Sequence, residues 1–121
     1  MAESHLLGQK GEDLAAGFLK DKGYQILYRN WTWGKHEIDI IAENNDFIVF
    51  AEVKTRSADF YLPPSASINS QKQRSIIFAA DGYIRKFNVT KEGRFDVITI
   101  IDNNGLFEID HIEDAFYPTL R

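Results

Sequence analysis

Cysteine is absent from this chain of 121 residues, and proline occurs only three times. The lack of cysteine excludes disulfides, thiolate zinc sites and cysteine nucleophiles together, and it is compatible with a reducing cytosol. Long apolar runs are absent as well, and charged residues such as Lys10 and Glu12 interrupt the first twenty positions. We therefore predict neither a signal peptide nor a membrane span, and we expect a cytoplasmic protein.

An excess of positive charge is also missing, because the formal net charge is -4 at pH 7. This balance argues mildly against an obligate nucleic-acid coat, which is usually basic. The charge is nevertheless uneven, since eight basic and four acidic residues lie between Glu52 and Arg94. That segment could form a basic face beside an acidic pocket, although a solvated helix surface explains Arg85 and Lys86 equally well.

Length and composition indicate a single globular domain over residues 1–121. Hydrophobic residues make up 44% of the chain and charged residues 26%, which suits one packed core. Helical spacing of apolar residues predicts one helix over Ser4–Lys22 and a second around Ile76–Phe87. Strands are predicted at residues 24–28, 37–43, 47–54, 94–101 and 106–112. This order favours an α/β sandwich with a central mixed sheet of about five strands flanked by helices.

Two segments between these elements are predicted to be irregular. Asn30–Gly34 is predicted to be a turn, and its two tryptophans, Trp31 and Trp33, either stack on nucleic-acid bases or fill an edge of the core. Ser57–Ser70 contains two adjacent prolines and many small polar residues, which predicts a loop beside the site described next.

Three acidic residues and one lysine fall on the two strands that flank residues 44–46. Residues two apart share a face of a strand, so Glu37 accompanies Asp39, and Glu52 accompanies Lys54. A two-residue loop at Asn45-Asp46 places Asp39 opposite Glu52 and Glu37 opposite Lys54. A loop one residue earlier shifts the pairing but keeps all four side chains on one face. One lysine cannot neutralise three carboxylates, so the cluster favours a divalent metal ion.

Simpler roles exist for these and other acidic residues. Asp39 and Lys54 could form a structural pair across the hairpin. Glu12, at the border of the apolar stripe of the first helix, either faces the sheet or is solvated. Asp96 lies among apolar residues of a strand, and we predict that it is a structural hydrogen-bond acceptor rather than a metal ligand.

Several short blocks of the chain resemble one known family. They are Gly11-Glu12, Arg29-Asn30-Trp31, Glu37 to Ala42, Phe50 to Arg56, Lys72 and Arg94 to Val97. In these blocks the chain resembles the PD-(D/E)XK superfamily of restriction-endonuclease-like nucleases. Over almost its whole length it resembles the bacterial YraN-like family assigned to that superfamily. Two departures, His36 in place of the usual glycine and the Leu62-Pro63-Pro64 region, leave every metal-site carboxylate in place.

The resemblance implies a restriction-endonuclease-like fold and a nuclease that hydrolyses DNA phosphodiester bonds, acting on branched or damaged DNA by analogy with resolvases. It implies that Asp39, Glu52 and Lys54 are catalytic, with Lys54 orienting or helping to deprotonate the attacking water. The implied ligands of Mg²⁺ or Mn²⁺ are Asp39, Glu52, the Val53 carbonyl, Glu12 and Glu37.

The expected partner is DNA, and the candidate nucleic-acid-binding residues are Arg56, Lys72 and Arg74. The competing class of function is a non-catalytic module that binds nucleic acid or protein and retains the nuclease fold. The sequence leaves open whether the protein is a homodimer.

Overall fold

The computed structural model describes residues 2–57 and 68–118, with side chains from Gly8 onward. The elements are α1 (Ala2–Asp21), β1 (Gln25–Trp33), β2 (His36–Glu43), β3 (Phe47–Ser57), α2 (Ser70–Phe87), β4 (Glu92–Asn103) and β5 (Leu106–Phe116). The predicted order of helices and strands is confirmed, and every strand except β2 continues beyond its predicted end. Most of the predicted loop at Ser57–Ser70 lies outside the described residues.

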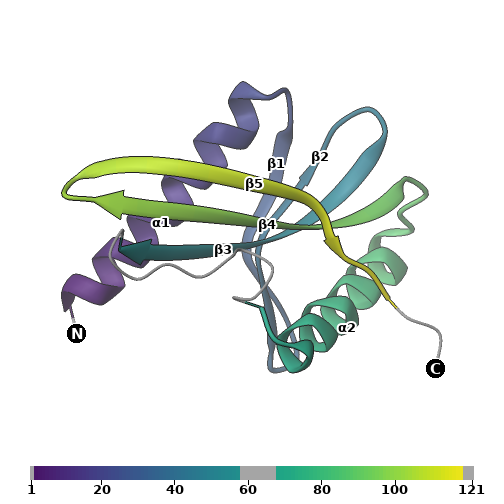
Figure 1. Cartoon of the computed structure of the whole chain (residues 1–121). Helices are drawn as coiled ribbons and strands as arrows, with labels where there is room; N and C mark the ends of the chain where they lie inside the picture. The colour runs from purple at the N-terminus through teal and green to yellow at the C-terminus, as the bar shows by residue number, and fades with distance from the viewer. Residues whose placement is uncertain (1, 58–67, 119–121) are drawn as a thin grey trace.

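The five strands form one mixed sheet in the order β1-β2-β3-β4-β5 (Figure 1). The β3 and β4 strands are parallel, and the other three neighbouring pairs are antiparallel. The α2 helix is the crossover between the two parallel strands, as such a connection requires. The predicted α/β class and mixed sheet are confirmed.

The two helices cover opposite faces of the sheet. In β3, Ile48 and Phe50 belong to the core cluster that contains Ile76 and Ala79 of α2. Val49, between them, belongs to the cluster that contains Ala15 and Leu19 of α1. Both faces of β3 are therefore buried, which explains its continuous apolar run. Among the described residues, no helix is both long and apolar enough to cross a membrane.

Asparagine caps fix both ends of α2. The Asn69 side chain accepts a hydrogen bond from the backbone N–H of Lys72 at 2.8 Å. At the other end Asn88 is left-handed with a φ of 51°, and its N–H bonds to the carbonyl of Ile84. The first cap holds Lys72 in the first turn of the helix.

The predicted turn at Asn30–Gly34 is wrong. Residues Asn30 to Trp33 belong to β1, and Trp31 to Trp33 pair with β2, so the turn contains only Gly34 and Lys35. The tryptophan side chains stack on one another with ring centroids 5.7 Å apart, and Trp31 also packs edge-on against Tyr83 of α2 at 5.2 Å. This packing stabilises an extended backbone, and the tryptophans fill an edge of the core.

Asp96 is a fully buried structural acceptor, as predicted. It accepts hydrogen bonds from Arg94 Nε at 2.9 Å, from His111 Nε2 at 2.7 Å and from the backbone N–H of Asp114 at 3.1 Å. Burial alone would raise the pKa of Asp96, but these hydrogen bonds together outweigh it and hold the pKa below its usual value. The network ties β4 to β5.

Candidate functional site

The hairpin of β2 and β3 has the register that a loop at Asn45-Asp46 requires. Its ladder runs from Glu43 opposite Ile48 to Ile40 opposite Ala51. Of the two registers compatible with the sequence, this one would place Asp39 opposite Glu52.

The two strands separate just past the last pair of the ladder. The backbone N–H of Val53 donates to Oδ2 of Asp39 at 2.9 Å instead of to a strand carbonyl. The Asp39 side chain therefore takes the place of the β2 carbonyl that would continue the ladder, and β2 and β3 separate at this point. In Figure 1 the turn between β1 and β2 lies near the start of α2, whereas β3 continues toward the N-terminal end of α1.

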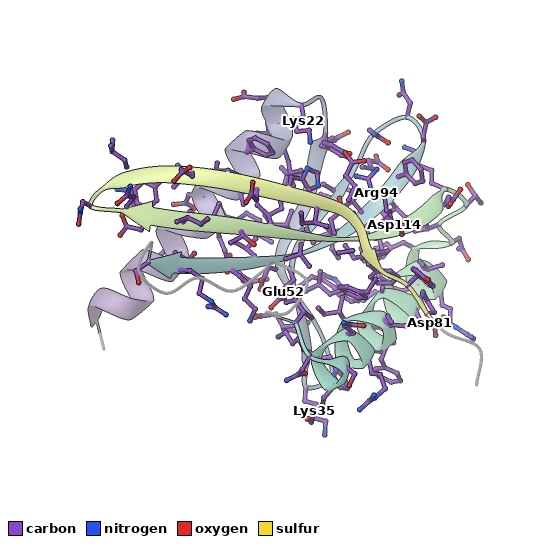
Figure 2. The ribbon with its side chains drawn as sticks, in the orientation of Figure 1. Lys22, Lys35, Glu52, Asp81, Arg94 and Asp114 are labelled. Carbon is purple, nitrogen blue, oxygen red and sulfur yellow. The ribbon has the colours of Figure 1, made fainter. Side chains whose placement is uncertain are left out.

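Glu52 is the most buried acidic residue at this opening, with 4% of its side chain exposed. Its Oε2 lies 3.6 Å from Nζ of Lys54 and 3.6 Å from Nζ of Lys72, while its buried Oε1 has no hydrogen-bond partner among the described residues. Figure 2 shows Glu52 between the sheet and the beginning of α2. A single carboxylate is thus contacted by one cation from the sheet and one from the helix.

Burial raises the pKa of Glu52 to about 7, and the adjacent charge of Asp39 contributes to the same shift. The two lysines oppose it only in part, and a hydrogen bond between the two carboxyl groups favours one shared proton. The pair therefore needs either a proton or another cation.

Glu12 of α1 faces the same opening. Burial, and then the charge of Asp39, raise the pKa of Glu12 above its usual value. It lines a hollow of about 400 Å³ with Gly8, Asp39, Glu52, Val53, Lys54 and Thr55. Of the two alternatives for Glu12, the structure supports the one in which it faces the sheet.

Glu37 lies next to this hollow and does not line it. It lines an adjacent hollow of about 740 Å³ together with Gly8, Gln9, Glu12, Asp13, Arg29 and Asn30. Glu12 borders both hollows and so connects them. Glu37 also lies beyond the end of the β2–β3 ladder and does not pair with Lys54. Its backbone partner is Thr32 of β1.

The remaining predicted residues divide into near and distant ones. Lys72 contacts Glu52, whereas Arg74 is exposed and lines an apolar groove on α2. Arg56 is half-buried, and its Nη1 donates to the carbonyl of Thr55 at 3.3 Å. Within the described residues Lys54 forms its ion pair with Glu52 and none with Asp39, which speaks against the simple structural pair.

The donor set suits a hard divalent cation that retains water ligands. Among residues 8–57 and 68–118, no three aspartate, glutamate or histidine side chains enclose a ready-made metal cage. Mg²⁺ is usually held by one or two carboxylates, with water and substrate phosphate completing its shell. Asp39 and the unpartnered Oε1 of Glu52 meet that requirement.

A family model described as uncharacterised protein family UPF0102 matches residues 11–100 of the chain. The chain belongs to the UPF0102 family. This confirms the resemblance to YraN-like proteins. The chain is 46% identical over 121 residues to a UPF0102 protein of Parabacteroides distasonis, with all of both chains covered. It is 48% identical to one of Bacteroides fragilis, with 99% of each chain covered, and 40% identical to one of Chlorobium phaeobacteroides, with 95% and 96% covered.

Two residues next to the candidate functional residues of this UPF0102 protein were not found from the sequence. Thr99 is the β4 partner of Lys54, and in the part of the chain that the structure describes its buried Oγ1 has no hydrogen-bond partner. A threonine within an apolar strand carries no functional signal, and its position depends on a parallel pairing that local sequence does not specify. Asn30 was assigned to a turn, although an asparagine between large aromatic and basic residues of a strand was an available sign of an unusual backbone.

Proposed function

We propose that this UPF0102 protein is a metal-dependent nuclease that hydrolyses DNA phosphodiester bonds. The observation that carries the proposal is the pair Asp39 and Glu52 at the opening between β2 and β3, with a desolvated carboxyl flanked by two lysines. Buried carboxylates in proteins are paired with cations or coordinate metal ions, and one or two carboxylates suffice for Mg²⁺. Clustered groups with a displaced pKa are also typical of catalytic sites.

Asp39, Glu52 and the carbonyl of Val53 would hold Mg²⁺ or Mn²⁺, with Glu12 supplying a further oxygen from α1. When bound, the metal ion polarises the phosphate and lowers the pKa of a water molecule. Lys54 would orient that water and offset the charge that develops on the phosphate. Lys72 would be the second cation for the same charge, because its Nζ lies 3.6 Å from the same Oε2 of Glu52.

The substrate proposed is DNA, including branched or damaged structures as in resolvase-like enzymes. That finer assignment, and membership of the PD-(D/E)XK superfamily, rest on the motif Asp39, Glu52-Val53-Lys54 and on the position of Glu12 in the first helix. Both are part of the proposal.

Purified protein should cleave linear, single-stranded or four-way DNA in the presence of Mg²⁺ or Mn²⁺, and chelator should abolish cleavage. Glu52→Gln and Lys54→Ala should each lower the rate by at least about a hundredfold, since each removes charge at the reacting phosphate. Lys20→Ala, at the exposed end of α1, is the matched control and should cleave like the wild type.

Cleavage that survives in Lys54→Ala would come from a contaminating enzyme and would contradict the proposal. The second candidate is a nucleic-acid-binding module without turnover, which the lack of a three-residue cage among the described side chains favours. Chelator-insensitive DNA binding without cleavage under any metal condition would select it.

A further inference from the structure

Asn30 has a left-handed backbone conformation in the middle of a strand. Its φ is 53°, although Arg29 before it pairs with Ile40 and Trp31 after it pairs with Ile38. Residues other than glycine rarely adopt this conformation, and asparagine tolerates it best because its short side chain can form local hydrogen bonds. Such a residue inside a regular element needs a structural reason.

The side chains of β1 change faces at Asn30. Residues two apart in a regular strand share a face, so Arg29 and Trp31 should point the same way. Trp31 instead packs against Tyr83 on the α2 side, while Nη2 of Arg29 lies 2.8 Å from Oδ1 of Asp13 on α1. The left-handed residue between them accounts for the change.

The neighbouring strand changes faces at the same level. Ile38 belongs to the core cluster on the α2 side, and Ile40 belongs to the cluster on the α1 side. Asp39 lies between them, at the position opposite Asn30 in the pairing of β1 with β2. Glu37 and Asp39, on either side of Ile38, line two adjacent hollows that both include Glu12 of α1.

The side chain of Asn30 also acts on the site. It lines the hollow that Glu12 shares with Glu37, and it forms a hydrogen bond with the Glu12 carboxylate. Burial, the largest effect, and the charge of Asp39 both raise the pKa of Glu12, and this hydrogen bond opposes them. Glycine at position 30 could adopt the same left-handed backbone but lacks the side-chain amide. Alanine lacks the amide and also disfavours the left-handed backbone.

We infer that Asn30 is a positioning residue of the site. Its left-handed backbone sets Asp39 at the opening between the strands, and its side-chain amide holds the Glu12 carboxylate beside that opening. The inference rests on the proposed function only for the claim that Asp39 and Glu12 receive a metal ion. The effects of Asn30 on these two carboxylates lie within the protein itself.

The first arm of the test is a double-mutant cycle of Asn30→Gly and Glu12→Ala, measured as melting temperatures in chelator. Asn30→Gly keeps the backbone and removes only the amide. We expect it to lower the melting temperature about 4 °C more in the wild-type background than in Glu12→Ala, the loss expected for one charge-assisted hydrogen bond. A difference of zero would overturn the inference, whatever the metal does.

The second arm is the Kd for Mn²⁺, measured by calorimetry. Removing a group that orients a metal ligand typically weakens affinity by about 10- to 100-fold, so Asn30→Gly should weaken binding and Asn30→Ala should weaken it further. Asn104→Gly is the matched control, because Asn104 is a left-handed asparagine in the distant turn before β5. Equal affinity in Asn30→Gly and Asn104→Gly would overturn the inference. A measurable coupling with no Mn²⁺ binding by the wild type would instead overturn the proposed function and retain the Asn30–Glu12 contact.

Discussion

A carboxyl group that takes up a proton near neutrality makes stability depend on pH, and Glu52 is such a group. Burial and then the charge of Asp39 raise its pKa from 4.5 to about 7. When the pKa of a carboxyl is higher in the folded state, its contribution to stability is complete below the unfolded pKa and is lost as the pH rises through the folded pKa. Above pH 7 the metal-free site should therefore lose about 3 kcal/mol of folding free energy.

Glu52→Gln should remove this dependence. Between pH 5 and pH 8 in chelator, the free energy of unfolding of the wild type should fall by up to about 3 kcal/mol relative to the mutant. Urea denaturation at both pH values measures it. Glu108→Gln, an exposed residue of β5, is the control and should follow the wild type. A wild type and Glu52→Gln that stay the same distance apart at both pH values would contradict the assignment.

At the scale of elements, two glycines set how closely the helices approach the sheet. A Cβ at Gly11 of α1 would meet Oγ1 of Thr55, and a Cβ at Gly82 of α2 would lie 2.6 Å from Nε1 of Trp33. A threonine can rotate, but a stacked indole cannot move without displacing the other tryptophan. The spacing of α2 from the sheet, and with it the reach of Lys72 to Glu52, therefore depends on Gly82.

Gly82→Ala should destabilise the protein by about 1–3 kcal/mol, because overpacking outweighs the better helix propensity of alanine. Gly17→Ala is the matched control, since Gly17 is an exposed glycine of α1 with open space around it. That change should stabilise by up to about 1 kcal/mol. Thermal melts of both variants decide the matter, and equal effects would mean that α2 can shift away from Trp33.

Local chemistry predicts the elements of this fold better than it predicts the site. The observed hairpin register is one of the two that residues 44–46 allow, and the two helices follow from the spacing of their apolar residues. Alternation fails at Asn30, because a single left-handed residue redirects two strands and no periodic pattern encodes it. The contact of Lys72 with Glu52 depends on a crossover helix, and Thr99 depends on a parallel pairing between segments distant in sequence.

At the scale of the whole molecule, a net charge of -4 must be reconciled with a polyanionic substrate. The basic residues of the central segment lie partly on α2, where Lys72 reaches the site and Arg74 is exposed. A cation that contacts a phosphate displaces a counterion, so its contribution appears in the salt dependence of binding rather than in the net charge.

Replacing Lys72 and Arg74 together by alanine should flatten the slope of log K against log salt concentration by about one unit for each lost duplex contact. Fluorescence anisotropy with catalytically inactive protein between low and moderate salt measures this slope. Lys20→Ala with Lys91→Ala removes the same charge far from the site and should leave the slope unchanged. Equal slopes in the two double mutants would mean that Lys72 and Arg74 do not contact phosphate.

The hydrogen bond from the Val53 N–H to Oδ2 of Asp39 joins the backbone of the sheet to a side chain of the candidate site. Oδ2 of Asp39 uses one lone pair to accept this backbone hydrogen bond, so Oδ1 and the second lone pair of Oδ2 are the positions at which Asp39 can bind another group. Any proton or ion that draws on Asp39 therefore changes the strength of a main-chain hydrogen bond at the end of the ladder. We therefore expect binding at the site to change the separation of β2 and β3.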